Sequence, residues 1–210
     1  MPRPTKNAPE RGDARTRLLE AARDVIRAKG FAATSVDDLC RAADVTKGAF
    51  FHSFGSKDAL GVAAADYWGR TTSDFFATAP YHRPDDPLDR ILAYIAFRKA
   101  MIVGALPEFT CLVGTMAQEV HATSPEIRDA CGRAMFGHAE TLVDDIEAAR
   151  RARGISGGWT AASLARHIHA VIQGGFVLAK AGNDPELARE NLDHLDRYVR
   201  RLFDVPEETA

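Results

Sequence analysis

Cysteine is scarce in this sequence, and the few cysteines show no pairing pattern. Only Cys40, Cys111 and Cys131 occur among 210 residues. Their number is odd, and their spacing fits neither a zinc site nor a disulfide framework. This composition argues against a small disulfide-stabilised secreted domain. We expect three reduced thiols in a cytoplasmic protein.

Long apolar runs are also missing. No stretch approaches the roughly 18 residues that a membrane-spanning helix needs, so no membrane partner is expected. The N-terminal segment MPRPTKNAPERGD is basic and rich in proline, but it has no apolar centre of the kind found in a secretory signal. We expect residues 1–12 to form a disordered basic arm and residues 205–210 a disordered tail.

Motifs for catalysis and metal binding are absent as well. The sequence contains no His-Glu-x-x-His, no Gly-x-Ser-x-Gly and no glycine-rich phosphate loop after a strand. His167 and His169 are two residues apart, which places them about 200° apart around a helix, so they cannot share one metal ion from one face. The protein is therefore expected to have no catalytic residues, no metal site and no cofactor.

The chain does have an uneven distribution of charge. Residues 1–61 hold 11 Lys and Arg against 8 Asp and Glu, whereas the remaining residues hold 16 against 21. The overall charge of −2 therefore combines a basic N-terminal part with an acidic remainder. This distribution suits a polyanionic partner at one end of the molecule, although an excess of three charges decides nothing by itself.

The local patterns are helical throughout. Strand-like alternation is absent, and Ala, Leu, Arg, Glu and Asp dominate the segments between glycines and prolines. These patterns predict an all-α fold of about nine helices. The expected helices cover 13–29, 34–43 with Thr34 or Ser35 as its cap, 46–53, 56–76, 87–105, 108–121, 124–153, 161–181 and 185–204.

The second and third of these helices are short and lie close together. Gly30 is placed to end the first helix, and the turn at Asp44 and Val45 separates the second helix from the third. Two short helices joined by about three residues and supported by a longer one predict a helix-turn-helix. Its small core is expected from Val36, Leu39, Val45, Phe50 and Phe54.

The start of the third helix is slim and polar. Thr46, Lys47, Gly48 and Ala49 form its first turn. A helix that enters the major groove of DNA needs small or polar side chains there, because bulk would keep its backbone away from the bases. Lys47 is long enough to reach a base edge or a phosphate. The pattern therefore favours DNA as the polyanionic partner.

The stretch TRLLEAARDVIRAKGFAATSVDDLCRAADVTKGAFFHSFGSKDAL, within residues 15–60, resembles the DNA-binding domain of the TetR family of bacterial transcriptional regulators. The matching features are Leu19–Ala22, Lys29-Gly30-Phe31, Val45–Gly48, Phe54 and Ser56-Lys57 with Leu60. The resemblance implies a helix-turn-helix domain at 13–56, followed at 57–204 by a helical domain for ligand binding and dimerisation.

The resemblance also implies which residues contact a double-stranded operator. They are Thr34, Ser35, Thr46, Lys47, Gly48, Ala49, Phe51, His52, Ser53 and Lys57. Two of them depart from the usual family pattern: Phe51 stands where Tyr is common, and Ser53 where His is common. These departures keep open an alternative, an all-α small-molecule-binding protein without operator recognition.

A homodimer is expected because one helix-turn-helix buries too little surface for operator specificity. The last two helices, about 161–204, each carry an apolar stripe, and the resemblance implies that they pair with their symmetry mates in a four-helix bundle. The stripes consist of Leu164, Ile168, Val171, Ile172, Gly175, Phe176 and Leu178, and of Leu187, Leu192, Leu195, Tyr198, Val199 and Leu202. Packing of both stripes within one subunit is the alternative.

The resemblance further implies a repressor that releases a palindromic operator when a small-molecule effector of unknown identity shifts the fourth helix. A transcriptional activator that keeps the same DNA site is the alternative. Candidate effector contacts are Tyr67, Trp68, Thr71, Phe75, Phe97, Met101, Cys111, Met116, Phe136 and Gln173. Cys111 lies near the N-terminus of the helix predicted at 108–121, where a thiol can act as a sensor of oxidants or electrophiles, or can be an inert buried side chain.

Overall fold

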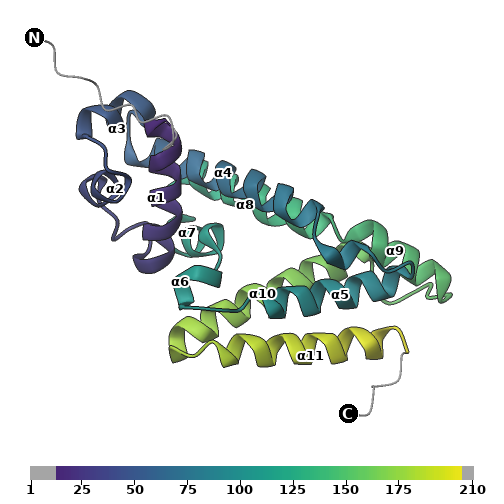
Figure 1. The fold of residues 1–210 in the computed structure, drawn as a ribbon. Coiled ribbons are helices and arrows are strands. Elements are labelled where there is room, and N and C mark those ends of the chain that lie inside the picture. The colour runs from purple at the N-terminus through teal and green to yellow at the C-terminus, as the bar shows by residue number, and fades with distance from the viewer. Residues whose placement is uncertain (1–12, 205–210) are drawn as a thin grey trace, which may run out of the picture.

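A computed structural model describes residues 13–204, and all the regular structure in this range is helical (Figure 1). The predicted arm and tail lie outside the described residues. The helices are α1 (Ala14–Lys29), α2 (Val36–Ala43), α3 (Lys47–Phe54), α4 (Lys57–Ala77), η2 (Pro80–His82), α5 (Pro87–Ala100), α6 (Leu106–Phe109), α7 (Leu112–Val120), α8 (Pro125–Glu140), α9 (Val143–Ala152), α10 (Ala161–Gly182) and α11 (Glu186–Leu202). The all-α prediction is confirmed.

Side-chain caps set the starts of the N-terminal helices. Asp13, Ser35, Thr46 and Ser56 each accept a hydrogen bond from a backbone N–H in the first turn of the helix that follows. Ser35, and not Thr34, caps α2, and the Asp38 carboxylate accepts a bond from the Ser35 N–H at 3.0 Å in return. Each cap satisfies donors that lack a partner within the helix, so these boundaries follow from local sequence.

Three of the predicted boundaries were wrong, because backbone conformation breaks helices that the apolar pattern continues. The helix expected at 87–105 ends at Ala100, before Gly104 with its φ of +77°. The helix expected at 108–121 is divided into α6 and α7 by extended backbone at Thr110. The helix expected at 124–153 breaks at Thr141 and Leu142, whose N–H groups bond three residues back instead of four.

The buried side chains form two clusters. The head cluster lies among the four helices α1, α2, α3 and α4, together with α7 and the first half of α8. It includes Leu18, Phe50 and Met116. The body cluster lies among α5, α9, α10 and α11. Helices α4 and α8 pack along each other and run from the N-terminal head, formed by α1, α2 and α3, into the body, formed by α5, α9, α10 and α11 (Figure 1). No helix among residues 13–204 is long and apolar enough to cross a membrane.

The two apolar stripes of α10 and α11 face mainly into their own subunit. Ile168, Ile172 and Phe176 are buried, as are Leu192 and Val199, and all of them belong to the body cluster. The core of a single chain therefore uses most of the residues that the sequence suggested for dimer contacts. The large side chains of the stripes that remain exposed are Leu178 and Tyr198.

Candidate DNA-binding surface and internal cavity

The helix-turn-helix core contains the side chains expected from the sequence. Leu39, Phe50 and Phe54 are buried, and Val36 and Val45 pack against them at the edge. The rings of Phe50 and Phe54 lie 6.0 Å apart between centroids. Since these two rings point inward, the opposite face of α3 is turned to solvent.

That opposite face is the candidate DNA-binding surface. Lys47, Gly48, Phe51 and His52 are exposed, and Phe51 leaves 52% of its surface accessible. Thr46 caps the helix, its Oγ1 accepting the Ala49 N–H at 3.1 Å. A side chain at position 48 would meet no atom of the protein closer than Thr46 Oγ1 at 3.7 Å. The fold therefore does not require glycine at this position.

Lys47 and Lys57 differ in how far they are engaged by the protein. Lys47 Nζ forms an ion pair with Asp37 at 2.8 Å, and both side chains are exposed, so the pair is weak and can exchange for a phosphate. Lys57 Nζ lies 4.5 Å from the centroid of the Phe31 ring and donates to the Ala32 carbonyl at 3.3 Å. Lys57 is thus directed to the turn after α1.

Thr34 does not fit the role expected for it. Its side chain is buried, and its hydroxyl donates to the Gly30 carbonyl at 2.6 Å. The hydroxyl stabilises the end of α1 and is not available to a phosphate. Ser53 is half-buried and donates to the Ala49 carbonyl one turn earlier at 2.8 Å. The other predicted contacts are half-buried at Ala49 and Lys57 and exposed at Ser35, Thr46, Lys47, Gly48, Phe51 and His52.

Two arginines of α1 hold the helix-turn-helix in place, and the sequence patterns gave no sign of this role. Arg17 Nη1 donates to the carbonyls of Ala43 and Asp44, at 3.3 and 3.1 Å, where α2 ends. Arg15 Nη1 donates to the Ser53 carbonyl at 2.8 Å, and its guanidinium lies 4.4 Å from the centre of the Phe54 ring. These bonds occupy carbonyls at helix C-termini, which cations favour.

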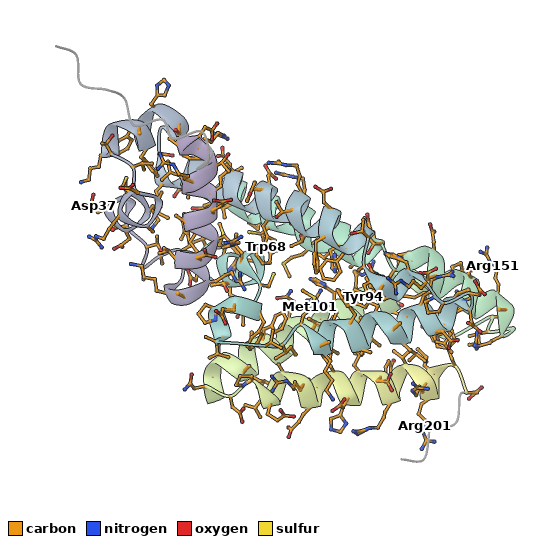
Figure 2. All side chains as sticks on the ribbon, in the orientation of Figure 1. Asp37, Trp68, Tyr94, Met101, Arg151 and Arg201 are labelled. Atoms are coloured by element: carbon orange, nitrogen blue, oxygen red, sulfur yellow. The ribbon has the colours of Figure 1, made fainter. Side chains whose placement is uncertain are left out.

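A cavity of about 330 Å³, partly open to solvent, lies where the body meets the head. Its walls come from α1, α4, α5, α6, α7, α8 and α10. Figure 2 shows Trp68, Met101 and Tyr94 in the interior between α4 and α8 on one side and α5 on the other. The cavity has the volume of a site for a small organic ligand.

Six of the ten predicted effector contacts line this cavity. They are Trp68, Thr71, Phe75, Met101, Cys111 and Gln173. The other four lie elsewhere: Met116 is fully buried in the head cluster, Tyr67 packs at the edge of that cluster, Phe97 stacks behind Phe75, and Phe136 is 60% exposed on the outside of α8. The apolar pattern could not separate a cavity wall from ordinary core.

The polar part of the cavity was not predicted from the sequence. Arg27, Arg98, His138 and His169 line it, together with Arg23 and Glu108. Arg98 Nη1 lies 3.1 Å from Tyr94 Oη and 3.2 Å from His138 Nε2, and Tyr94 Oη lies 2.9 Å from the same nitrogen. Since a guanidinium can only donate, His138 Nε2 acts as an acceptor in this cluster.

Burial, reinforced by the charge of Arg98, lowers the pKa of both histidines. The pKa of His138 falls to about 3 and that of His169 to about 4. Below pH 6.5 the unfolded chain protonates these side chains, whereas the folded protein keeps them neutral. The unfolded state then binds more protons, so the free energy of unfolding falls as the pH falls.

We expect each histidine to lower the free energy of unfolding by roughly 2 kcal/mol between pH 6.5 and 5.0. Urea unfolding at both pH values measures this loss. His138→Gln is expected to lose about 2 kcal/mol less than the wild type over this interval, because one titrating group is gone. His52→Gln, at an exposed position, is the control. Equal losses in wild type and H138Q would show that His138 is not neutral in the folded protein.

Two contacts connect the cavity walls to the head. Arg27 projects from α1, the helix that supports the helix-turn-helix, into the cavity. Helix α7 begins after Cys111, whose Sγ accepts the Gly114 N–H at 3.4 Å, and near its end Glu119 accepts the Ala32 N–H at 2.8 Å. Within residues 13–204, no group of three or more His, Cys, Asp or Glu is placed to hold a metal ion.

Known proteins share both parts of this architecture. A family model described as bacterial regulatory proteins, tetR family, matches residues 18–64, and one described as tetracyclin repressor-like, C-terminal domain, matches residues 87–195. The HTH-type transcriptional repressor NemR of Escherichia coli K12 is 26% identical over 192 residues, covering 89% of this chain and 94% of NemR.

Two solved structures of similar proteins share the fold of this chain. The crystal structure of reduced E. coli NemR superimposes with a TM-score of 0.71 at 26% identity, covering 87% of this chain and 95% of that one. A TetR transcriptional regulator from Chloroflexus aurantiacus J-10-FL has a TM-score of 0.76 at 25% identity, covering 90% and 94%. These family models and relatives define the protein as a DNA-binding transcriptional regulator. The chain belongs to the tetR family of bacterial regulatory proteins.

Proposed function

We propose that the protein is a repressor that binds a palindromic operator as a homodimer and leaves it when a small organic molecule occupies the cavity between head and body. The observation that carries this proposal is the free, slim first turn of α3, with Gly48 open to solvent beside Lys47. The relative NemR, which matches almost the whole chain, is itself a transcriptional repressor.

The proposed DNA contacts follow from the exposed positions. The first turn of α3 enters the major groove, with Lys47 reaching a base edge or phosphate once it leaves Asp37. Ser35 and Ser56 lie at the starts of α2 and α4, where free backbone N–H groups favour phosphate oxygens. Phe51 and His52 lie on the same exposed side of the helix and contact the sugar–phosphate backbone.

The proposed dimer interface is the outer face of α10, together with the neighbouring part of α11. Ala170, Gly174, Val177, Leu178 and Ala181 share this face of α10, since they recur at helical spacing, and all five are exposed in the single chain. Gly174 has no atom within 4 Å of where a Cβ would lie, so a second helix can approach closely. Tyr198 of α11, whose ring lies 5.1 Å from that of His167, extends the face.

The proposed release mechanism uses the elements that join cavity and head. Trp68, Thr71 and Phe75 place α4 in the cavity wall, and α4 begins beside the DNA-binding surface. A ligand that favours a different separation of α4 from α5 and α10 changes the distance between the two recognition helices. A coupling of about 1–3 kcal/mol between the two sites is sufficient to shift operator affinity roughly five- to 150-fold.

Replacing Lys47 by alanine is expected to weaken operator binding about tenfold or more, because each half-site loses one charge-assisted contact. The slope of log K against log salt should also become shallower by about 2 for the dimer. Fluorescence anisotropy with a palindromic duplex, over a range of salt concentrations, measures both quantities.

The matched control is Lys99→Ala. Lys99 also forms an ion pair, with Asp193 at 2.5 Å, but it lies in the body on α5. K99A should keep the affinity and the salt slope of the wild type. If K47A keeps the operator affinity of the wild type, or if K99A loses as much affinity as K47A, Lys47 does not contact the operator.

A further inference from the structure

The cavity has an excess of positive charge that its own side chains do not neutralise. Three arginines line it, against one carboxylate, Glu108, while His138 and His169 are neutral. Arg23 is paired with Asp24, its Nε lying 2.7 Å from Asp24 Oδ1. Among residues 13–204, no carboxylate forms an ion pair with Arg27 or Arg98.

Arg27 is the more deeply buried of these two arginines. Only 9% of its surface is accessible, and its Nε is buried without a hydrogen-bond partner among the described residues. Its guanidinium lies 5.3 Å from the centre of the Trp68 ring. Burial lowers the pKa of Arg27, although the carboxylates of Asp24 and Glu108 act in the opposite direction. A buried guanidinium with an unused donor is costly unless an acceptor arrives from outside.

Arg98 supplies a second cation on the body side of the cavity. Its guanidinium lies among the rings of Phe76, Tyr94 and Phe176, at 5.2, 5.8 and 5.9 Å from their centroids. Its hydrogen bonds go to Tyr94 and His138, which are both neutral at pH 7. Beside it, the Nδ1 of His169 is also buried without a partner among the described residues.

We infer that the cavity binds a small organic carboxylate, whose charged group is held by Arg98 or Arg27 and whose aromatic or aliphatic body lies among Trp68, Phe75 and Phe176. A carboxylate supplies the negatively charged partner that neither guanidinium has among the described residues, and an acceptor for the unpartnered Nε of Arg27. Planar bidentate pairing with a carboxylate suits arginine. The aromatic walls provide the apolar contact area. The inference rests on the proposed function, since it names the chemical class of the effector.

The position of the two arginines also gives the charge a regulatory role. Arg27 belongs to α1, which carries Arg15 and Arg17 to the ends of α3 and α2, whereas Arg98 belongs to the body. A carboxylate attracts both cations toward itself and thereby biases α1 relative to α5. Charge in the ligand is therefore expected to matter both for affinity and for operator release.

The test compares acids with their uncharged amides. Isothermal titration calorimetry is run with benzoate, phenylacetate, 3-phenylpropionate and 4-phenylbutyrate, and with the four corresponding carboxamides. At least one acid should bind about 10–100-fold more tightly than its amide. Arg98→Gln, Arg27→Gln or both should reduce this preference about tenfold or more, and Arg98→Lys should keep part of it.

Arg128→Gln is the matched control, because Arg128 lies on α8 outside the cavity lining and pairs with the next residue, Asp129, as Arg23 pairs with Asp24. It should leave the acid–amide preference within about threefold of the wild type. Circular dichroism checks that each variant is folded. The inference is overturned if no acid binds, if amides bind as tightly as acids, or if the preference survives in both R98Q and R27Q.

Operator binding, measured on the same preparations, separates this inference from the function on which it rests. If the wild-type protein binds a palindromic duplex and acids and amides release it equally well, the proposed repressor function stands and the carboxylate assignment is overturned. If the protein binds the acids but does not bind the duplex, the carboxylate assignment stands and the proposed repressor function is overturned.

Discussion

Replacing Gly48 with glutamate is expected to lower operator affinity more than about 100-fold while leaving the protein folded. Gly48 is exposed in the first turn of α3, where a side chain would project toward the base edges and hold the backbone away from them. The added negative charge would also face the phosphates. Because a dimer carries two copies, both half-sites lose their contacts together.

The same substitution should stabilise the helix. A Cβ at position 48 has free space, and glycine within a helix costs about 1 kcal/mol relative to alanine. A carboxylate in the first turn also interacts favourably with the helix dipole. Thermal unfolding should therefore give an unchanged Tm or a rise of a few degrees, roughly 2–4 °C. Loss of binding with a raised Tm distinguishes a groove contact from damage to the fold.

The matched control for this experiment is Gly157→Glu. Gly157 lies in the loop between α9 and α10, is exposed, and has no atom within 4 Å of where a Cβ would lie. G157E adds the same charge at a site far along the chain from α3, and it should bind the operator like the wild type. Normal binding by G48E would mean that α3 does not enter the groove.

Replacing Leu178 with glutamate is expected to raise the dissociation constant of the dimer more than about 100-fold. Leu178 is 49% exposed in the single chain, on the outer face of α10 beside Gly174. In the proposed dimer this side chain is covered, so the substitution places an unpaired carboxylate at an apolar contact twice. Sedimentation velocity measures the change, and circular dichroism should show an unchanged helix content.

Loss of the dimer should also weaken operator binding, because a monomer reads only one half-site and cannot use the two-fold symmetry of the palindrome. The control is Ala96→Glu, which adds a charge at an exposed position of α5 and should leave the dimer intact. A dimeric L178E protein, or a monomeric A96E protein, would place the interface on another face of the molecule.

The N-terminal head agrees closely with the sequence prediction. Caps, glycines and spacing are local features, so Ser35, Thr46 and Ser56 begin their helices where the sequence predicted. Thr34 is the exception. The sequence left Thr34 or Ser35 as the cap of α2 and predicted a DNA contact at Thr34, but the turn after Gly30 directs the Thr34 hydroxyl back to the end of α1. Thr34 and Ser35 are adjacent in this turn, yet Thr34 is buried and Ser35 is exposed.

The body was less predictable, because apolar residues have the same periodicity in a cavity wall, a core and a dimer face. Phe75 lines the cavity, Phe97 stacks behind it, and Phe136 lies on the outside, yet all three are phenylalanines on helices. Likewise, Ile168 is buried within the subunit whereas Leu178 on the same helix is exposed. Only the positions of the neighbouring helices distinguish these cases.

The all-α class, the helix-turn-helix and the slim start of α3 could all be predicted from residues within a few positions of one another, since helix capping and groove access depend on local geometry. The charged cavity could not. Arg27, Arg98, His138 and His169 are distant in the chain, and they become neighbours only because α1, α5, α8 and α10 pack around one space. Burial then changes their chemistry, keeping the histidines neutral and leaving the arginines without a carboxylate partner within residues 13–204.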